Sequence, residues 1–444
     1  MADECVTVVG GGLAGCECAC QLADRGVRVK LCEMRPVVSS PAHRTSDLAE
    51  LVCSNSLKSM RPDSAAGLLK EELTRMGSAL LRCARQAAVP AGGALAVDRE
   101  RFSELVEAEV AARPLIEVVR GEVTDIPQGP CVIAAGPLCS PALSERVLHL
   151  VGGEALSFFD AAAPVVDAAT IDRSVVFAQS RYDEKGGGDY LNAPFTRDEY
   201  DAFIDALVGA ERVVLRDFER GDLFQACQPA EEVARTGHDA IRFGAMKPVG
   251  LTDPRTGRRP WAAVQLRAEN AACTAYNLVG FQTNLTFGEQ KRVFRMIPGL
   301  QDAEFFRYGV MHRNTFVDAP HVLDRTFAVP GTRVRLAGQI TGTEGYTEAI
   351  ASGLLAALNT FADLRSLPQV QLPQTGAFGS LVAYATDPAT EGYQPMHVNF
   401  GIVPPLEGQR IRNKRERYAA YAARACSDLD SYIAARGDLF GMLG

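Results

Sequence analysis

The strongest constraint on the fold is the stretch VTVVGGGLAGCECACQLADRGVRVKLCEM, which spans residues 6–34. An apolar, β-branched run meets a cluster of glycines, an alanine-rich segment follows, and a second apolar run ends in an acid. The periodicity predicts a buried strand over residues 5–10, a helix over 13–25 and a second buried strand over 27–33. This strand–helix–strand unit is typical of a domain that binds a dinucleotide.

Gly10, Gly12 and Gly15 have the spacing G-x-G-x-x-G directly after the first strand and at the start of the helix. The first glycine permits the tight turn, the second lets a pyrophosphate approach the backbone, and the third lets helix and strand pack closely. Glu33 ends the second strand, 21 residues beyond Gly12, where a carboxylate accepts hydrogen bonds from ribose hydroxyls. We therefore expect the dinucleotide at Gly10, Gly11, Gly12, Leu13, Ala14, Gly15 and Glu33.

An acid at position 33 disfavours the 2′-phosphate of NADP at this site and leaves FAD, NAD and S-adenosylmethionine as alternatives. A second strand, glycine turn and helix, LAGQITGTEGYTEAIASG, favours FAD, because flavoproteins bring the backbone amides of such a late segment against the flavin. We expect Gly338 and Gln339 at the strand end that meets the flavin, and Gly342, Gly345 and Tyr346 in the turn that follows. The Tyr346 ring either packs in the core or, as we prefer, stacks on the flavin or a bound pterin.

The two glycine turns lie near opposite ends of the 444-residue chain, and the residues between them change character. That middle part contains the run EKGGGDY, the stretch DLFQACQPAEE and the stretch VMHRNTF. We predict a split Rossmann-like α/β FAD-binding domain of the glutathione-reductase type, formed by residues 1–150 and 325–444. Residues 151–324 would form an inserted α+β domain that binds the substrate.

The cysteine pattern argues against disulfides and metal sites. Cys16, Cys18 and Cys20 fall on one predicted buried helix, and among the twelve cysteines there is neither a CxxC pair nor a Cys/His spacing of zinc type. Most of these thiols would act as small hydrophobic side chains. We expect reduced cysteines and no metal ion.

The net charge of −8 is unlike that of a typical nucleic-acid binder, but basic residues gather in three segments. They are either solvated faces or contacts to phosphates, and their members are Arg255, Arg258 and Arg259, then Lys291 and Arg292, then Arg410, Arg412, Lys414 and Arg415. No apolar run approaches the length of a membrane helix, and the chain enters its first strand without a basic leader. We expect a cytoplasmic protein that does not bind membranes.

Two cysteines occupy polar surroundings. Cys53 lies in ELVCSNSLKS, a turn that continues to Lys58, where a cation and free amides would favour a thiolate. Cys227 lies in FQACQPAEE, just before a helix that a proline opens. From residue types alone, an inert thiol is the more common outcome for each.

Several long stretches resemble one family, the folate- and FAD-dependent tRNA (uracil-5-)-methyltransferases (TrmFO), relatives of the MnmG (GidA) tRNA-modifying flavoproteins. The matching stretches extend over nearly the whole chain and are GGGLAG, ELVCSNSLKS, VPAGGALAVDRERFS, GGGDYLNAPFT, RFGAMKPVGLTDPRTGRRPWAAVQLRAEN, YNLVGFQTNLTFGEQKRVFRMIPGL, YGVMHRNTF, AGQITGTEGYTEAIASGLLA and NFGIVPPLE.

The resemblance implies methylation of uracil C5 at uridine 54 in the tRNA T loop. The carbon would come from 5,10-methylenetetrahydrofolate, and the electrons from reduced FAD that NADH or NADPH recharges. By similarity, Cys227 would add to C6 of the uracil, and Cys53 would remove the C5 proton or add to the flavin in the resting enzyme; the two roles are exchangeable. His312 and Arg313 would contact folate or substrate, or form a structural polar pair. The inserted domain would bind the RNA, and the resemblance implies no obligate protein partner.

The chain departs from the family pattern at three positions. Gln225 stands where an acid is usual, Gln228 where an aliphatic residue is usual, and Ala193 where a third cysteine is usual. These changes keep open a related chemistry on ribosomal RNA. An MnmG-like modifier of the wobble uridine, a generic FAD oxidoreductase and a flavoprotein that binds RNA without catalysis are further alternatives.

Overall fold

The computed structural model describes residues 4–40, 42–152, 156–181, 188–213, 228–408 and 411–441. Its central element is a parallel sheet in the order β16-β7-β1-β2-β6. The strands are β1 (Cys5–Val9), β2 (Arg28–Glu33), β6 (Ile116–Arg120), β7 (Cys131–Ile133) and β16 (Val334–Leu336). Because β16 pairs with β7, the C-terminal part of the chain completes the sheet that the N-terminal part begins.

Two buried helices cover this sheet and cross each other at close range. They are α1 (Leu13–Asp24) and α10 (Tyr346–Arg365). A Cβ atom at Gly353 of α10 would lie 2.1 Å from the carbonyl oxygen of Ala14 in α1, so only glycine allows this contact between the two backbones. The crossing therefore holds the N-terminal ends of both helices near the same edge of the sheet.

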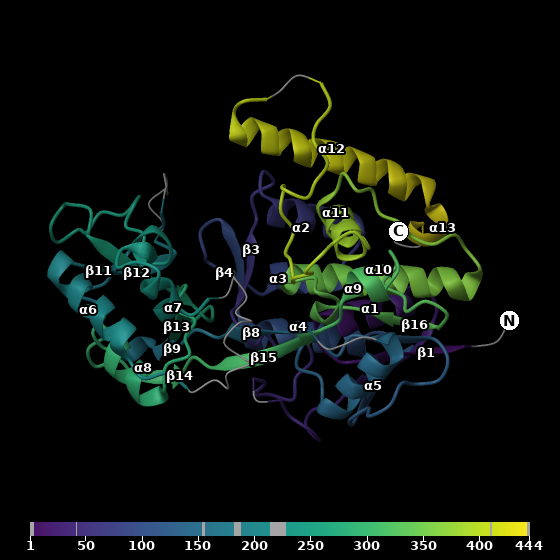
Figure 1. Cartoon of the computed structure of the whole chain (residues 1–444), viewed down its shortest axis with the longest axis horizontal. Helices are drawn as coiled ribbons and strands as arrows, with labels where there is room; N and C mark the ends of the chain where they lie inside the picture. Colours follow the sequence, from purple (N-terminus) through teal and green to yellow (C-terminus); the bar gives the residue numbers. More distant parts are fainter. Residues whose placement is uncertain are drawn as a thin grey trace.

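Further helices and a small sheet complete this half of the molecule. Their bounds are α2 (Ala65–Arg75), α3 (Ala79–Gln86), α4 (Arg99–Ala111), α5 (Pro141–Val151), α9 (Ala319–Val322), α11 (Ala377–Ala385), α12 (Lys414–Ala435) and α13 (Gly437–Phe440), with strands β3 (Ser56–Ser59), β4 (Ala88–Val89) and β5 (Ala94–Val97). Figure 1 shows α12 lying across this half in yellow, and an ion pair of 3.0 Å between Arg75 and Asp430 joins it to α2.

Residues from the middle of the chain build a second body with its own core. An antiparallel sheet has the order β10-β11-β12-β13-β9-β14, and among the described residues three α-helices pack on it. The strands are β9 (Val165–Asp167), β10 (Phe177–Ala178), β11 (Tyr190–Phe195), β12 (Ala262–Ala268), β13 (Ala275–Leu278) and β14 (Phe305–Arg307); the helices are α6 (Arg197–Gly209), α7 (Ala230–Arg235) and α8 (Phe287–Phe294). Its apolar core is separate from that of the first body.

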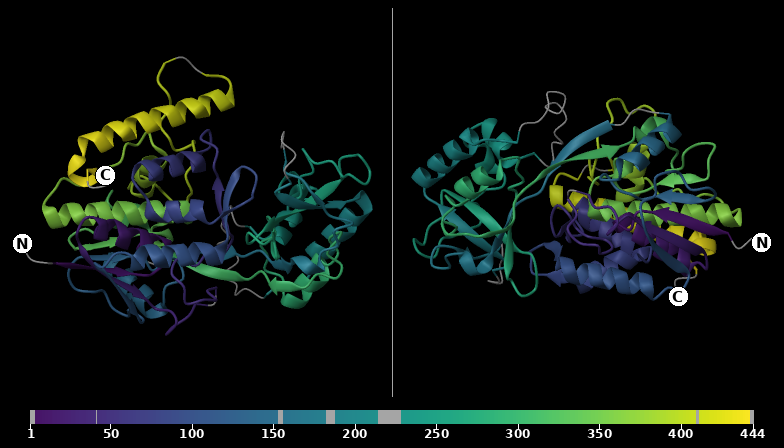
Figure 2. Two further views of the ribbon diagram at one scale, coloured as in Figure 1. Left: turned by 180° about the vertical axis from the view of Figure 1, so that it is seen from behind. Right: turned by 90° about the horizontal axis from the view of Figure 1, so that it is seen from below.

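A two-stranded antiparallel ribbon connects the two bodies. It consists of β8 (Leu156–Ala161) and β15 (Met311–Phe316), which pair along their full lengths. Figures 1 and 2 show this ribbon running from the parallel sheet to the second body. The chain thus leaves the first body and returns to it along neighbouring strands.

The structure confirms the predicted fold class, a Rossmann-like α/β fold with an additional α+β body. The predicted strand, helix and strand over residues 5–33 correspond to β1, α1 and β2. No helix of the described residues is long and apolar enough to cross a membrane.

Candidate functional site

A cavity of about 420 Å³ lies where the two bodies meet the carboxyl ends of β1 and β7. Its wall combines residues from the two glycine turns, from the segment around Cys53 and from the second body. Nine of the residues predicted to contact the cofactor line it, namely Gly10, Gly12, Leu13, Ala14, Glu33, Gly338, Gln339, Gly345 and Tyr346. Segments far apart in the sequence therefore share one site.

The first glycine turn has the geometry that its motif predicts. Gly10 has a φ of +108°, and a Cβ there would lie 2.4 Å from the carbonyl oxygen of Ala134. A Cβ at Gly15 would lie 1.8 Å from the carbonyl oxygen of Gly10, whereas one at Gly12 would meet no atom within 4 Å. Gly10 and Gly15 thus serve the packing of the turn, and Gly12 leaves open space for a ligand. No side chain caps the N-terminus of α1 at Gly12, so its first amides can bind an anion.

Glu33 is buried at the end of β2 and is held by three hydrogen bonds. Its Oε2 accepts the N–H of Gly11 at 2.8 Å, and its Oε1 accepts the N–H and the Nε–H of Arg35 at 3.0 and 2.8 Å. Burial opposes ionisation, but the Arg35 guanidinium and these amides hold the pKa of Glu33 below its ordinary value. Glu33 is therefore an oriented carboxylate at neutral pH, at the edge of the cavity.

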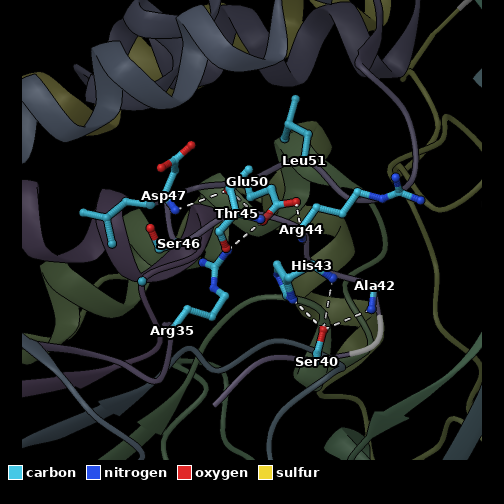
Figure 3. A network of polar contacts seen from close by, with 12 residues as sticks. Arg35, Ser40, Ala42, His43, Arg44, Thr45, Ser46, Asp47, Glu50 and Leu51 are labelled. Carbon is cyan, nitrogen blue, oxygen red and sulfur yellow. Dashed lines mark hydrogen bonds and ion pairs between the residues drawn. The ribbon is translucent and has the colours of Figure 1, made fainter. Parts of the chain in front are cut away.

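A second carboxylate supports this arrangement from the segment that follows. Arg35 is fully buried, and its Nη1 donates to Glu50 Oε2 at 2.9 Å. Figure 3 shows that the Glu50 carboxylate also accepts the backbone N–H groups of Arg44 and Thr45. The Glu33–Arg35–Glu50 network therefore fixes the loop over residues 44–50 against the dinucleotide-type turn.

The second glycine turn faces the first across the cavity. Gly338 has a φ of +81° and Gly345 a φ of +121°, and no side chain caps the N-terminus of α10 at Gly345. A Cβ at Gly342 would overlap the ring of Tyr393, so this glycine permits packing behind the cavity wall. Because α1 and α10 cross at Ala14 and Gly353, two uncapped helix N-termini point toward the same space.

Side chains from distant elements hold the segment that carries Cys53. Arg99 donates to the carbonyl oxygen of Leu51, and Arg307 donates to that of Val52 at 3.2 Å. The N–H of Cys53 donates to the Tyr346 hydroxyl oxygen at 2.8 Å. The segment is thus fixed at three successive residues, and Cys53 lines the cavity. Burial raises the pKa of the Tyr346 hydroxyl above its ordinary value, so this group stays neutral.

Lys58 also lines the cavity and lies next to a buried carboxylate. Its Nζ is 3.5 Å from Glu348 Oε1, and Glu348 belongs to the first turn of α10. This ion pair connects the Cys53 segment to the second glycine turn. The predicted effect of Lys58 on the ionisation of Cys53 stays a prediction.

The second body and the connecting ribbon contribute polar residues that the sequence patterns did not single out. Arg267 on β12 is buried and donates through Nε to Asn55 Oδ1 at 2.8 Å, while Asn277 and Asn314 face the cavity from β13 and β15. All three occur in stretches that resemble the family, which contain QLRAEN, YNLVGF and MHRNTF. For Asn277, a polar residue in the mostly apolar strand AYNL was an available signal; the strands of Arg267 and Asn314 contain other polar residues and offered no such signal.

The remaining residues that the sequence analysis singled out either do not line the cavity or are not among the described residues. Cys227, Gln225 and Arg410 lie outside the described residues, and so do the side chains of His312 and Arg313. Ala193 is fully buried in the core of the second body.

The basic segments differ in how far their cations are already paired. Arg255 forms an ion pair with Asp253 at 2.8 Å, and Arg292 forms one with Glu289 at 2.5 Å. The remaining exposed members within the described part are Arg258, Arg259, Lys291, Arg412, Lys414 and Arg415, the last of which lies 3.3 Å from Asp63. The described residues contain no cluster of side chains able to hold a metal ion.

Comparison with known sequences gives matches over almost the whole chain. Residues 5–368 match the family model of glucose inhibited division protein A, GidA. The methylenetetrahydrofolate–tRNA-(uracil-5-)-methyltransferase TrmFO of Geobacter sulfurreducens is 54% identical over 431 residues, which cover 97% of this chain and 99% of that protein. The proteins of the same name from Symbiobacterium thermophilum and Streptococcus pneumoniae are 53% and 51% identical and cover 97% and 98% of this chain, and 98% and 100% of their own lengths.

Among solved structures, Aquifex aeolicus GidA superposes with a TM-score of 0.67. The identity is 16%, and the match covers 97% of this chain and 76% of that chain. This similarity shows a common fold.

Proposed function

Because this chain belongs to the TrmFO proteins within the GidA family, we propose that it methylates C5 of uridine 54 in the T loop of tRNA. The proposed carbon donor is 5,10-methylenetetrahydrofolate, and the proposed reductant is FAD that NADH or NADPH reduces. The identity of more than half of the residues over nearly the full chain supports the reaction.

The observation that carries the proposal is the cavity that joins two uncapped helix N-termini, Glu33 and the Cys53 segment. These features fit FAD: the open space at Gly12 and the amides at the start of α1 suit a pyrophosphate, and the Glu33 carboxylate suits a ribose. Gly338, Gln339, Gly345 and Tyr346 would surround the flavin ring. Bound FAD would supply the electrons that turn a transferred one-carbon unit into a methyl group.

The two cysteines would provide the rest of the chemistry. Carbon C5 of uracil is a poor nucleophile until a thiolate adds at C6, which breaks the C5–C6 double bond and moves its electron pair to an enolate. We assign this addition to Cys227 and the removal of the C5 proton to Cys53, whose position at the cavity wall supports such a role. The C5 electron pair first forms a bond to the one-carbon unit, and the π bond between that carbon and its carrier nitrogen breaks. When Cys53 then takes the C5 proton, the C6–S bond breaks and the C5–C6 double bond returns. A hydride supplied by reduced FAD would replace the remaining bond to the carrier nitrogen and complete the methyl group.

Recognition of the RNA would combine phosphate contacts with extrusion of the target base. A T-loop uridine is stacked inside the tRNA, so an enzyme reaches C5 and C6 only after the nucleotide is flipped out. The exposed cations Arg258, Arg259 and Lys291 on the second body would contact phosphates. In that case, tRNA binding weakens steeply as the salt concentration rises. Removing one of these cations should reduce the slope of log Kobs against the logarithm of the salt concentration by about one.

Methyl transfer to defined RNAs tests the proposal. Undermodified tRNA and ribosomal RNA are incubated separately with the protein, labelled methylenetetrahydrofolate and either NADH or NADPH. We expect label in uridine 54 of tRNA, and loss of it in Cys53→Ala and Cys227→Ala. Cys426→Ala is the control, because Cys426 is half-buried on α12 and does not line the cavity. Label confined to ribosomal RNA, or full activity in both cysteine variants, would overturn the proposal.

A further inference from the structure

Two buried asparagines in the cavity wall leave amide atoms without hydrogen-bond partners. Asn277 is 2% exposed and Asn314 is 1% exposed. Among the described residues, Asn277 Nδ2 and Asn314 Oδ1 have no partner. One is a donor and the other an acceptor, and both side chains belong to residues that line the cavity.

Buried asparagines elsewhere in this protein are satisfied by the protein itself. Asn359 Nδ2 donates to the carbonyl oxygen of Val370 at 3.3 Å, and its Oδ1 accepts the N–H of Val370 at 2.7 Å. Asn55 donates to two carbonyl oxygens and accepts from Arg267. Folded proteins satisfy almost all buried polar groups, and an unsatisfied group lowers stability. Other buried side-chain atoms of the described residues also lack a partner, among them Trp261 Nε1 and Thr360 Oγ1, but those residues do not line the cavity. Asn277 and Asn314 place an unpaired donor and an unpaired acceptor in the wall of one cavity, and we infer that their partners arrive with a ligand.

The position of the two asparagines restricts where that ligand lies. Asn314 is three residues before Val317, whose N–H donates to the carbonyl oxygen of Ile340 at 2.9 Å in the second glycine turn. Asn277 comes from the opposite body, on the strand that pairs with β9. The asparagines thus approach the cavity from the ribbon beside the glycine turn and from the sheet of the second body.

We propose that Asn277 and Asn314 recognise the lactam edge of a pyrimidine-type ring, with the Asn277 amide donating to a ring carbonyl and the Asn314 amide oxygen accepting a ring N–H. This inference rests on the proposed function, which brings three such rings to the cavity: the flavin, the pterin of the folate and the target uracil. All three carry a carbonyl beside an N–H. A purely apolar or purely anionic ligand would leave one of the two amides unpaired.

The test uses Asn277→Leu and Asn314→Leu, which keep side-chain volume and remove the polar atoms. Asn359→Leu is the matched control, since it removes a buried asparagine whose amide is satisfied within the protein. In the flavin-free full-length protein, we expect the two cavity variants to keep or raise the melting temperature, and Asn359→Leu to lower it. This measurement requires no methylation and is independent of the RNA target.

Three binding measurements then identify the ring. FAD affinity is measured by flavin titration, tetrahydrofolate affinity by difference spectra of the holoenzyme, and use of the RNA by the KM for tRNA. We expect one of the three values, the Kd for FAD, the Kd for tetrahydrofolate or the KM for tRNA, to rise about 10- to 100-fold in both cavity variants. The value that rises identifies the ring that the two asparagines bind. Unchanged constants, together with melting temperatures lowered as far as in Asn359→Leu, would mean that the amides only support the fold and would overturn the proposal.

Discussion

The hydroxyl oxygen of Tyr346 accepts the backbone N–H of Cys53 at 2.8 Å, although the two residues are 293 positions apart. The same oxygen accepts the N–H of Ser54 at 3.1 Å. Tyr346 is the first residue of α10, directly after the second glycine turn. The helix that frames the cavity therefore also sets the position of the segment that presents the thiol.

Tyr346→Phe should reduce methylation more than it reduces flavin content. The phenylalanine ring keeps the packing but leaves the amides of Cys53 and Ser54 without an acceptor, a loss of about 1–3 kcal/mol in the free energy of unfolding. A misplaced thiol lowers kcat by about 10- to 100-fold. Steady-state methylation of tRNA and flavin absorbance of the purified protein measure the two effects.

A matched control is available in the second body. The Tyr200 hydroxyl donates to the carbonyl oxygen of His238 at 2.8 Å, away from the cavity. Tyr200→Phe should lower stability and leave kcat near the wild-type value. An equal loss of kcat in both variants would show that the phenol of Tyr346 has no specific effect on the Cys53 segment.

Gly12→Ala and Gly15→Ala should separate ligand binding from folding. A Cβ at Gly12 meets no protein atom within 4 Å, whereas one at Gly15 would lie 1.8 Å from the carbonyl oxygen of Gly10. Gly12→Ala should keep the melting temperature of the flavin-free protein but weaken FAD binding at least about tenfold, because a pyrophosphate at the turn needs close backbone approach. Gly15→Ala should lower the melting temperature itself. Undiminished FAD affinity in Gly12→Ala would argue against a pyrophosphate at this turn.

Glu33→Gln should destabilise the protein at neutral pH and have less effect in acid. The substitution removes a charge that Arg35 faces at 2.8 Å, and breaking such a buried pair costs about 3 kcal/mol. The pKa of Glu33 is lower in the folded than in the unfolded protein. Its contribution to the free energy of unfolding is therefore present at a pH above the unfolded pKa and disappears as the pH falls through the folded pKa. Denaturant unfolding at pH 7 and pH 4 should show a smaller difference between variant and wild type at pH 4. A difference that grows toward acid would contradict the lowered pKa.

Glu72 should make the protein less stable as the pH rises from 5 to 8. Its buried carboxylate accepts the N–H groups of Ala377 and Phe378 at the start of α11, yet burial raises the pKa of Glu72 to about 7. Because the pKa of Glu72 is higher in the folded than in the unfolded protein, its contribution to the free energy of unfolding is fully present below the unfolded pKa. This contribution of up to about 3 kcal/mol is lost as the pH rises through 7. Glu72→Gln should remove this dependence, so the stability of wild type relative to the variant should fall with pH. A difference in the free energy of unfolding between wild type and Glu72→Gln that stays constant from pH 5 to pH 8 would contradict the raised pKa of Glu72.

Local patterns in the sequence were sufficient to predict the Rossmann-like fold. The apolar runs, the glycine spacing and the acid at Glu33 each act within about one βαβ unit, and a single turn geometry satisfies them together. The second glycine turn could also be predicted from the sequence, because its glycines mark positions where the backbone needs a positive φ, as Gly338 and Gly345 have. That both turns border one cavity follows from the crossing of α1 and α10.

Contacts between distant elements were beyond these patterns. Tyr346 was expected to pack or to stack on a ring, and nothing near it in sequence indicates that its hydroxyl binds the Cys53 amide. Asn277 and Asn314 belong to different strands of different sheets, and only the folded arrangement brings their amides to the cavity. Such pairings depend on how two bodies dock, which periodicity and spacing do not encode.

The ribbon of β8 and β15 has a consequence for how such a protein can arise and vary. Leu156 and Phe316 pair directly across this ladder, so the points where the chain departs and returns are neighbours. Excising everything between them would leave two ends that a short linker can rejoin, with each strand of the parallel sheet untouched. The segment between these two residues can therefore change in length or sequence without breaking the backbone pairing of the parallel sheet.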